Sequence, residues 1–197
     1  GNNISREEIV KVITNFDGIV IIDEAYSDFS REKNFRSELK KYPNIIVLNT
    51  FSKAWGCAAI RLGMAFADKE IINLFNKVKY PYNINALTQK KALEIIDDYS
   101  DVHEWLRLIL MERTHMIKAF RDLPICERVY PTDANFFLAK MDDAQAVYDY
   151  LVEKGIIVRN RTRVRLCNNC LRVTIGTRSE NAELIGAIRQ FSEAHKA

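Results

Sequence analysis

Apolar and polar residues follow two different patterns along the chain, and the pattern changes near Tyr80. Before that point, amphipathic stretches separate three short apolar runs, which are GIVII at 18–22, IIVL at 45–48 and RLGMAFA at 61–67. Apolar runs that do not alternate with polar residues are typical of strands buried in a parallel sheet. The first part therefore predicts an α/β region, a mostly parallel sheet with both faces covered. In the stretch before the first run, Ser5 precedes Glu8 at the spacing of a helix capping box.

The second part of the chain is mainly helical at first and then mixed. Residues 85–122 place apolar side chains at helical spacing and contain no proline, which predicts one long helix, or two with a break near Tyr99 and Ser100. Beyond Pro124, the segments ANFFLAK, IIVRN and CLRVTIG predict strands. AQAVYDYLVEKG and SENAELIGAIRQFSEAHK predict helices, the first ending at Gly155. We expect residues 1–84 to belong to a large domain, 85–122 to form an interdomain helix region, and 123–197 to form a small α+β domain.

Composition excludes several classes of protein. The 197 residues are 48% hydrophobic and 28% charged, and 29 basic against 26 acidic residues give a net charge of +3, too even to indicate nucleic-acid binding by itself. The apolar runs are far shorter than a membrane span, and no signal-peptide pattern opens the chain. We expect a cytoplasmic protein with no nucleic-acid or membrane partner.

The cysteines do not indicate a metal site. Of the four, Cys167 and Cys170 form a C-x-x-C motif, but no second cysteine pair or histidine cluster accompanies them. A structural zinc site would need two more ligands. We therefore favour free thiols over a redox or metal motif.

Polar residues follow the first two predicted strands at the points where those strands end. Asp23 and Tyr26 follow the first, and Thr50, Ser52 and Lys53 follow the second. In parallel α/β sheets, the carboxyl ends of the strands lie at the edge where ligands bind. Each residue alone has an ordinary alternative role, such as capping a turn or helix. Together they indicate one crevice that holds an acid, a phenol, hydroxyls and an amine.

That set of groups fits pyridoxal 5′-phosphate. The cofactor needs an amine to bind its aldehyde, for which Lys53 is the candidate, and a carboxylate facing the ring nitrogen, for which Asp23 is the candidate. Tyr26 could donate to the phenolic oxygen. Arg61 lies among apolar neighbours, where a guanidinium is costly unless it meets an anion. We therefore expect Arg61, with Thr50 and Ser52, to bind the cofactor phosphate.

The segments IVIIDEAYSDF and NTFSKAWGCAAIRLG resemble the cofactor-binding signatures of fold-type I pyridoxal-phosphate aminotransferases. Four later segments are similar to segments of the same family in the same order: PYNIN at 81–85, PTDANFFLAK at 131–140, GIIVRN at 155–160 and CLRVTIGTRSEN at 170–181. The resemblance covers nearly the whole chain. It implies a homodimeric enzyme in which Lys53 binds the cofactor and moves the substrate α-proton.

The later segments narrow the resemblance to a subgroup that acts in histidine synthesis, on glutamate and imidazole-acetol phosphate. In that subgroup, Arg172 matches the residue that receives the anionic end of both substrates, and Arg159 matches one that assists with the substrate phosphate. Without the resemblance, the sequence pattern around these two arginines gives weaker support for their substrate roles. Arg172 would share the polar face of a strand with Thr174, opposite Leu171, Val173 and Ile175. The stretch RNRTRVR would align four arginines if it were extended, although we favour a hairpin.

The length of the chain departs from the family, whose members run to roughly twice this size, consistent with two full lobes. We expect a C-terminal part of the fold, cut near Gly1, that lacks half of the pocket and exposes a sheet edge and an apolar face. Other readings are another aminotransferase of the same subgroup or a threonine-phosphate decarboxylase. A third is the non-catalytic, cofactor-binding effector domain of a transcription regulator, which would need a DNA-binding segment upstream.

Overall fold

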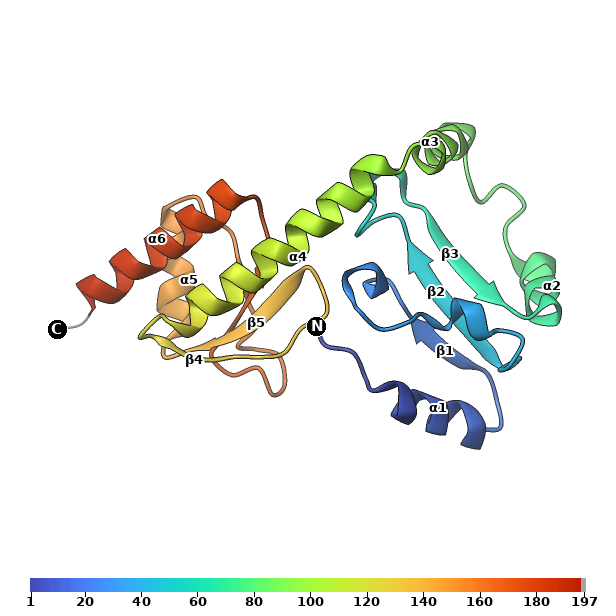
Figure 1. Cartoon of the computed structure of the whole chain (residues 1–197), viewed down its shortest axis with the longest axis horizontal. Coiled ribbons are helices and arrows are strands. Elements are labelled where there is room, and N and C mark those ends of the chain that lie inside the picture. The colour runs from blue at the N-terminus through green and yellow to red at the C-terminus, as the bar shows by residue number, and fades with distance from the viewer. Residues whose placement is uncertain (196–197) are drawn as a thin grey trace. The chain divides into compact units, whose positions relative to one another are not determined.

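The computed structural model describes residues 1–195 and divides into two compact units (Figure 1). The N-terminal unit comprises residues 3–106. The C-terminal unit joins residues 1–2 to the chain from Arg107 onward, so the division falls within helix α4 (Ser100–Arg121). The limits expected from the sequence, 1–84, 85–122 and 123–197, divide the chain more finely and stay a prediction.

The N-terminal unit contains a three-stranded sheet in the order β1 (Val20–Asp23), β2 (Ile45–Thr50), β3 (Gly63–Ala67). β1 and β2 are parallel, as predicted, whereas β3 is antiparallel to β2. A parallel partner needs a long crossover, usually a helix. The connection 51–62 contains only the short helix η3 (Ala58–Ile60), so the chain turns back.

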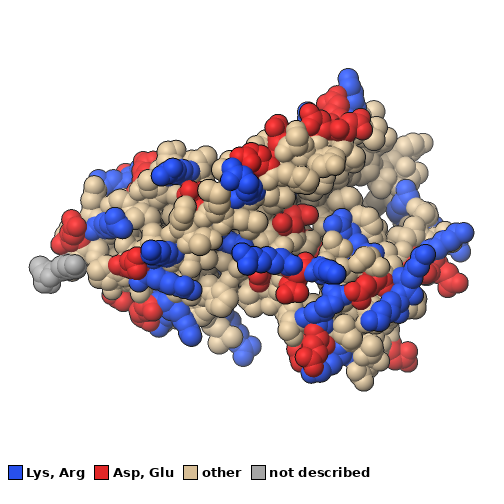
Figure 2. All heavy atoms as spheres, in the orientation of Figure 1, with Lys and Arg blue, Asp and Glu red and all other residues tan. Residues whose placement is uncertain are grey.

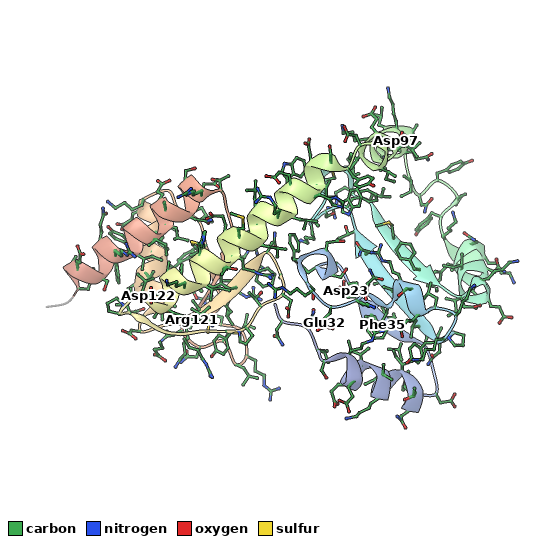
Figure 3. All side chains as sticks on the ribbon, in the orientation of Figure 1. Asp23, Glu32, Phe35, Asp97, Arg121 and Asp122 are labelled. Atoms are coloured by element: carbon green, nitrogen blue, oxygen red, sulfur yellow. The ribbon has the colours of Figure 1, made fainter. Side chains whose placement is uncertain are left out.

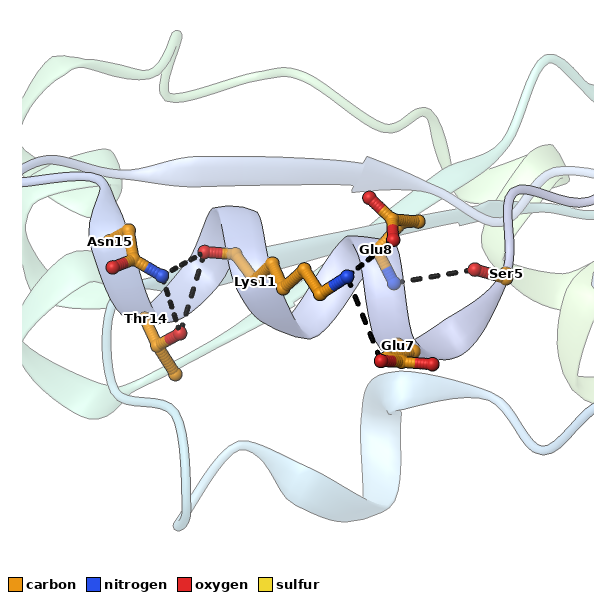
Figure 4. A network of polar contacts seen from close by, with 6 residues as sticks. All are labelled: Ser5, Glu7, Glu8, Lys11, Thr14 and Asn15. Carbon is orange, nitrogen blue, oxygen red and sulfur yellow. Dashed lines mark hydrogen bonds and ion pairs between the residues drawn. The ribbon is translucent and has the colours of Figure 1, made fainter.

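Helix α1 (Arg6–Asn15) begins at Ser5, as the capping spacing predicts. The Ser5 hydroxyl accepts a hydrogen bond from the Glu8 backbone N–H, and Lys11 forms ion pairs with Glu7 and Glu8 on the exposed side (Figure 4). The opposite side of the helix contributes Ile13 to a buried cluster. The other members of that cluster are Phe35 from helix η2 (Phe35–Glu38), Tyr42, and Ile45 and Val47 from β2.

The expectation that the first strand is buried on both faces is wrong. Burial alternates along β1. Ile21 is 61% exposed, and Ile19, just before the strand, is 49% exposed. β1 pairs only with β2 among the described strands, so it forms an edge of the sheet. The exposed edge and apolar face expected for a partial fold are therefore observed.

The helical segment of the sequence is divided in two. α3 (Ala86–Asp97) ends before Asp98, and α4 starts at Ser100, which confirms the predicted break. The Ser100 hydroxyl and backbone N–H donate to the Asp98 carboxylate, and these bonds lower the pKa of Asp98. Helix α2 (Lys69–Val78), which precedes them, was not singled out by the sequence pattern.

The C-terminal unit is a four-stranded antiparallel sheet with helices on one face. Its strand order is β4 (Cys126–Val129), β5 (Phe136–Met141), β7 (Cys170–Thr174), β6 (Arg159–Asn160). Alternate residues of β5 and β7 pack into a core with α5 (Ala144–Glu153), α6 (Arg178–Ala194) and the last turns of α4. At its centre, Phe120 and Phe137 are fully buried, and their rings meet edge to face with centroids 4.8 Å apart.

Basic and acidic side chains are interspersed on the visible surface (Figure 2), in keeping with the nearly even charge balance. In the part of the chain that the structure describes, no helix combines the length and the apolar character needed to cross a membrane.

Candidate active site

Lys53 lies in a loop that closes on itself directly after β2. The Phe51 N–H donates to the Leu62 carbonyl at 3.1 Å, the Cys57 N–H donates to the Phe51 carbonyl at 2.9 Å, and the Gly56 N–H donates to the Lys53 carbonyl at 3.0 Å. Gly56 has a φ of +65°, a left-handed conformation that glycine adopts without a steric cost. Phe51 is buried while Lys53 is exposed, so the loop is anchored and its lysine faces outward.

The ends of β1 and β2 are neighbours, as the sequence predicts. Asp23 lies opposite Leu48 in the parallel pair, and the Glu24 N–H donates to the Leu48 carbonyl at 2.9 Å. This register brings two predicted site residues together: Lys53 Nζ lies 5.2 Å from the ring centroid of Tyr26, a cation–π distance.

Asp23 is the last residue of β1 and is exposed (Figure 3). Its Oδ1 accepts a hydrogen bond from the Ala25 N–H at 3.0 Å, so this carboxylate also caps the turn that follows. Side chains alternate between the two faces along β1, so Asp23 lies on the same exposed face as Ile21. A carboxylate beside an exposed apolar side chain is a suitable surface for a flat ring that carries a protonated nitrogen.

The three residues expected to bind phosphate lie where the lysine loop closes. Thr50 Oγ1 donates to the Leu62 carbonyl at 3.1 Å and accepts from the Ser52 N–H at 3.0 Å. Arg61 is exposed, has a φ of +54°, and donates from Nη1 to the Ala58 carbonyl at 2.9 Å. A left-handed conformation in a residue other than glycine costs on the order of 1 kcal/mol. The local contacts of Thr50 and Arg61 hold the loop, and their phosphate role stays a prediction.

Two buried polar residues support this site and were not identified from the sequence. Asn49 accepts from the Thr50 N–H through Oδ1 at 2.6 Å and donates from Nδ2 to the Glu24 carbonyl at 3.3 Å, which ties the ends of β1 and β2 together. Glu24 Oε1 accepts from the Phe35 N–H at 2.7 Å, and burial raises the pKa of Glu24. For Asn49, the sequence did offer one indication, which is a single asparagine within the otherwise apolar part of the strand IIVLNT.

The two arginines expected to bind substrate are neighbours in the C-terminal unit. Arg159 on β6 lies directly opposite Arg172 on β7, so both side chains share one face of the sheet. Arg172 Cζ lies 4.9 Å from the Phe136 ring centroid. Leu171, Val173 and Ile175 are buried on the other face, which confirms the predicted orientation of the strand.

The hairpin that carries Arg159 also borders a cavity of about 530 Å³. RNRTRVR is extended only at Arg159 and Asn160 and then turns, so the alignment of four arginines does not form, whereas the favoured hairpin does. The cavity is lined by Arg159, Arg161 and Arg163 and by no acidic residue among those described. Thr162, also in the lining, has a buried hydroxyl oxygen with no hydrogen-bond partner in the described structure. Such a lining suits an anion.

Residues 1–188 match the family "Aminotransferase class I and II". The chain therefore belongs to this family, which confirms the family and fold expected from the sequence. Histidinol-phosphate aminotransferase of Bacteroides fragilis (strain YCH46) is 57% identical over 191 residues, which cover 97% of this chain and 55% of that protein. The chain thus spans about half the length of the curated relatives it matches.

Solved structures share the fold. The histidinol-phosphate aminotransferase from Clostridium acetobutylicum matches 97% of this chain and 60% of its own, with a TM-score of 0.89 at 24% identity. The same enzyme from Sinorhizobium meliloti, in complex with pyridoxal-5′-phosphate, matches 95% of this chain and 53% of its own, with a TM-score of 0.83 at 22% identity. In the described residues, no group of histidine, cysteine, aspartate or glutamate side chains is arranged to hold a metal ion.

Proposed function

We propose that this chain is part of a histidinol-phosphate aminotransferase that transfers the amino group of glutamate to imidazole-acetol phosphate, forming 2-oxoglutarate and histidinol phosphate. The observation that carries the proposal is the contact between Lys53 and Tyr26 at neighbouring strand ends, in a chain of the aminotransferase family. The substrate assignment is supported by the 57% identity to a curated relative of that name.

The residues of the N-terminal unit fit pyridoxal 5′-phosphate as the cofactor. When bound, this cofactor acts as an electron sink that stabilises negative charge at the substrate α-carbon. Lys53 would hold its aldehyde carbon and, as a free amine, would move the proton at the substrate α-carbon. Asp23 would keep the ring nitrogen protonated, and Tyr26 would donate to the phenolic oxygen. Thr50, Ser52 and Arg61 would bind the phosphate.

The C-terminal unit would recognise the substrate through charge. Two guanidinium groups on one face of adjacent strands can bind a carboxylate or a phosphate with several charge-assisted hydrogen bonds. We assign Arg172 to the anionic end of both substrates and Arg159 to the substrate phosphate. The family resemblance further supports a cytoplasmic homodimer.

The proposal is tested by locating the bound cofactor. Purified full-length protein is incubated with pyridoxal 5′-phosphate, reduced with borohydride, digested and analysed by mass spectrometry. We expect the reduced adduct on Lys53, and we expect Lys53→Ala to lose both the adduct and the transamination activity. Lys41→Ala is the matched control, because Lys41 is also exposed and also lies over a tyrosine ring, with Nζ 4.8 Å from the Tyr42 centroid.

An adduct that persists in Lys53→Ala would show that Lys53 does not hold the cofactor. The substrate assignment is checked separately, by comparing kcat/KM for transamination of imidazole-acetol phosphate with kcat/KM for decarboxylation of threonine phosphate. A higher kcat/KM for the decarboxylation would overturn the substrate assignment, but it would not contradict the proposed cofactor site. Cofactor binding without either reaction would favour the effector domain of a regulator.

A further inference from the structure

Cys167 and Cys170 lie at the two ends of a tight turn that leads into β7. Asn168 and Asn169 form the centre of the turn, and the Cys170 N–H donates to the Cys167 carbonyl at 3.1 Å. Asn169 has a φ of +52°, a left-handed conformation that asparagine tolerates at this position of a turn. Two cysteines at the first and last positions of a β-turn have Cα atoms within about 7 Å of each other. Disulfides span roughly 4.4–6.8 Å between Cα atoms, so the Cα separation of such a turn is compatible with a disulfide.

The backbone of this turn is fixed on both sides. The Asn169 carbonyl accepts from the Met141 N–H at 2.8 Å, and Asn169 Nδ2 donates to the Asp142 carbonyl at 3.0 Å. The Cys170 carbonyl accepts from the Arg161 N–H at 2.8 Å, and the Cys167 N–H donates to the Val164 carbonyl at 3.0 Å. The backbone of the turn is thus held by hydrogen bonds on both sides, which keeps its two terminal cysteines close together.

The two thiols differ in exposure. Cys170 is 1% exposed, and its Sγ lies 3.4 Å from the Asn168 carbonyl oxygen, so the sulfur points back over the turn. Burial, followed by the neighbouring Cys167 thiol, raises the pKa of Cys170. Cys167 is partly exposed, and both cysteines are free in this structure. One thiol is thus accessible to a reagent, while the other is sheltered beside it.

We propose that Cys167 and Cys170 form a thiol-modification site that reacts with small-molecule disulfides and closes to an intramolecular disulfide. The Cys167 thiolate attacks one sulfur of the reagent, which forms a mixed disulfide and releases one thiol. The Cys170 thiolate then attacks the Cys167 sulfur, which breaks the mixed disulfide and releases the second thiol. Two cysteines are oxidised, and the reagent is reduced to two thiols that take up the two protons. The inference does not depend on the proposed aminotransferase activity.

Oxidised glutathione tests the order of the two steps. Full-length protein is incubated with it, quenched with an alkylating agent, digested and analysed by mass spectrometry. We expect a Cys167–Cys170 disulfide in the wild type and glutathione retained on Cys167 in Cys170→Ser. In Cys167→Ser, we expect modification of Cys170 to be at least about tenfold slower, because that thiol is sheltered and its protonated form is favoured. Cys57→Ser and Cys126→Ser are controls that retain the pair and should oxidise like the wild type.

A disulfide with Cys57 or Cys126, a link between two chains, or no oxidation of the pair would overturn the proposal. Phenylarsine oxide gives a second measurement that needs no variant to fold, because it bridges two thiols that lie close together. We expect the wild-type protein to bind it on the peptide that carries both cysteines, and a dithiol but not a monothiol to release it. Binding elsewhere, or release by a monothiol, would also contradict the proposal.

Discussion

Asp23 and Glu24 are adjacent carboxyl groups with opposite environments. Asp23 is exposed at the end of β1, where it is available to a ligand, whereas Glu24 is buried and accepts a hydrogen bond from the Phe35 N–H. Because successive side chains of an extended chain point to opposite faces, one carboxyl group faces the candidate site and the next holds the loop behind it. The motif DEAY thus combines a proposed ligand contact with a structural one.

The environment of Glu24 predicts a dependence of stability on pH. Its folded-state pKa is raised above the ordinary value of 4.5 by burial, so its stabilising contribution is fully present below about pH 4.5 and is lost as the pH rises through the folded pKa. We expect Glu24→Gln, which keeps an acceptor for the Phe35 N–H, to lose less unfolding free energy than the wild type over that interval. Urea unfolding at a series of pH values measures this.

Glu32→Gln serves as the control, because Glu32 is exposed in the same loop (Figure 3). Asp28, whose pKa is also raised by burial, would retain part of the wild-type slope in Glu24→Gln. An unchanged slope in Glu24→Gln would show that ionisation of Glu24 does not affect stability.

At the scale of elements, the β6–β7 hairpin decides which arginines act together. β6 contains only Arg159 and Asn160, yet its pairing with β7 sets Arg159 directly opposite Arg172. Neither residue is distinctive in the sequence, since an arginine on the polar face of a strand is most often solvated. Their shared position on one face is the feature that fits an anionic substrate.

We therefore expect Arg172→Ala and Arg159→Ala each to raise KM for imidazole-acetol phosphate by roughly tenfold or more, the scale of a lost charge-assisted hydrogen bond. Because the two residues are cross-strand neighbours, the double variant should lose less than the product of the single effects. Steady-state kinetics of the full-length protein measures all three.

Arg128→Ala is the matched control, because Arg128 lies on β4 of the same sheet, opposite Lys140, which forms an ion pair with Glu127. Arg128→Ala should leave KM unchanged. If the KM increase of the double variant equals the product of the two single-variant increases, Arg159 and Arg172 do not bind the same substrate group.

At the scale of the whole molecule, the three-stranded sheet is open along β1 among the described strands. The chain spans about half the length of its curated relatives, and β1 leaves one strand edge unpaired among the described residues, with Ile21 61% exposed. Exposed apolar strand edges favour association with other chains.

We expect the 197-residue chain, expressed alone, to self-associate, and Ile21→Lys to reduce this association because a charged residue at a sheet edge disfavours strand pairing. Static light scattering over a range of concentrations measures the change. Ile4→Lys is the control, since Ile4 is 67% exposed but precedes α1 and belongs to no strand. Equal association of Ile21→Lys and the wild type would exclude the β1 edge as the contact.

Much of the local structure followed from the sequence. The Ser5 cap, the break near Tyr99 and the buried face of β7 were all predicted, because each depends on residues that are close together in the chain. The meeting of the β1 and β2 ends was predicted from the general rule that parallel strands end at one edge of the sheet. The chemistry of the candidate site was predicted too, since an amine, a carboxylate and a phenol just after two strands can be read without knowing the fold.

Other features depended on which segments pair. The antiparallel direction of β3, the exposure of Ile21, the position of Arg159 opposite Arg172 and the support that Asn49 gives to the strand ends are set by contacts between residues distant in the sequence. A hydrophobic pattern indicates that a strand has a buried face, but it does not identify what covers that face. The sequence by itself thus determined most of the elements, though not α2 or β4, and the reactive groups of this protein. Only the tertiary structure decided that β3 runs antiparallel to β2 and that Arg159 faces Arg172, because strand pairing and packing are non-local.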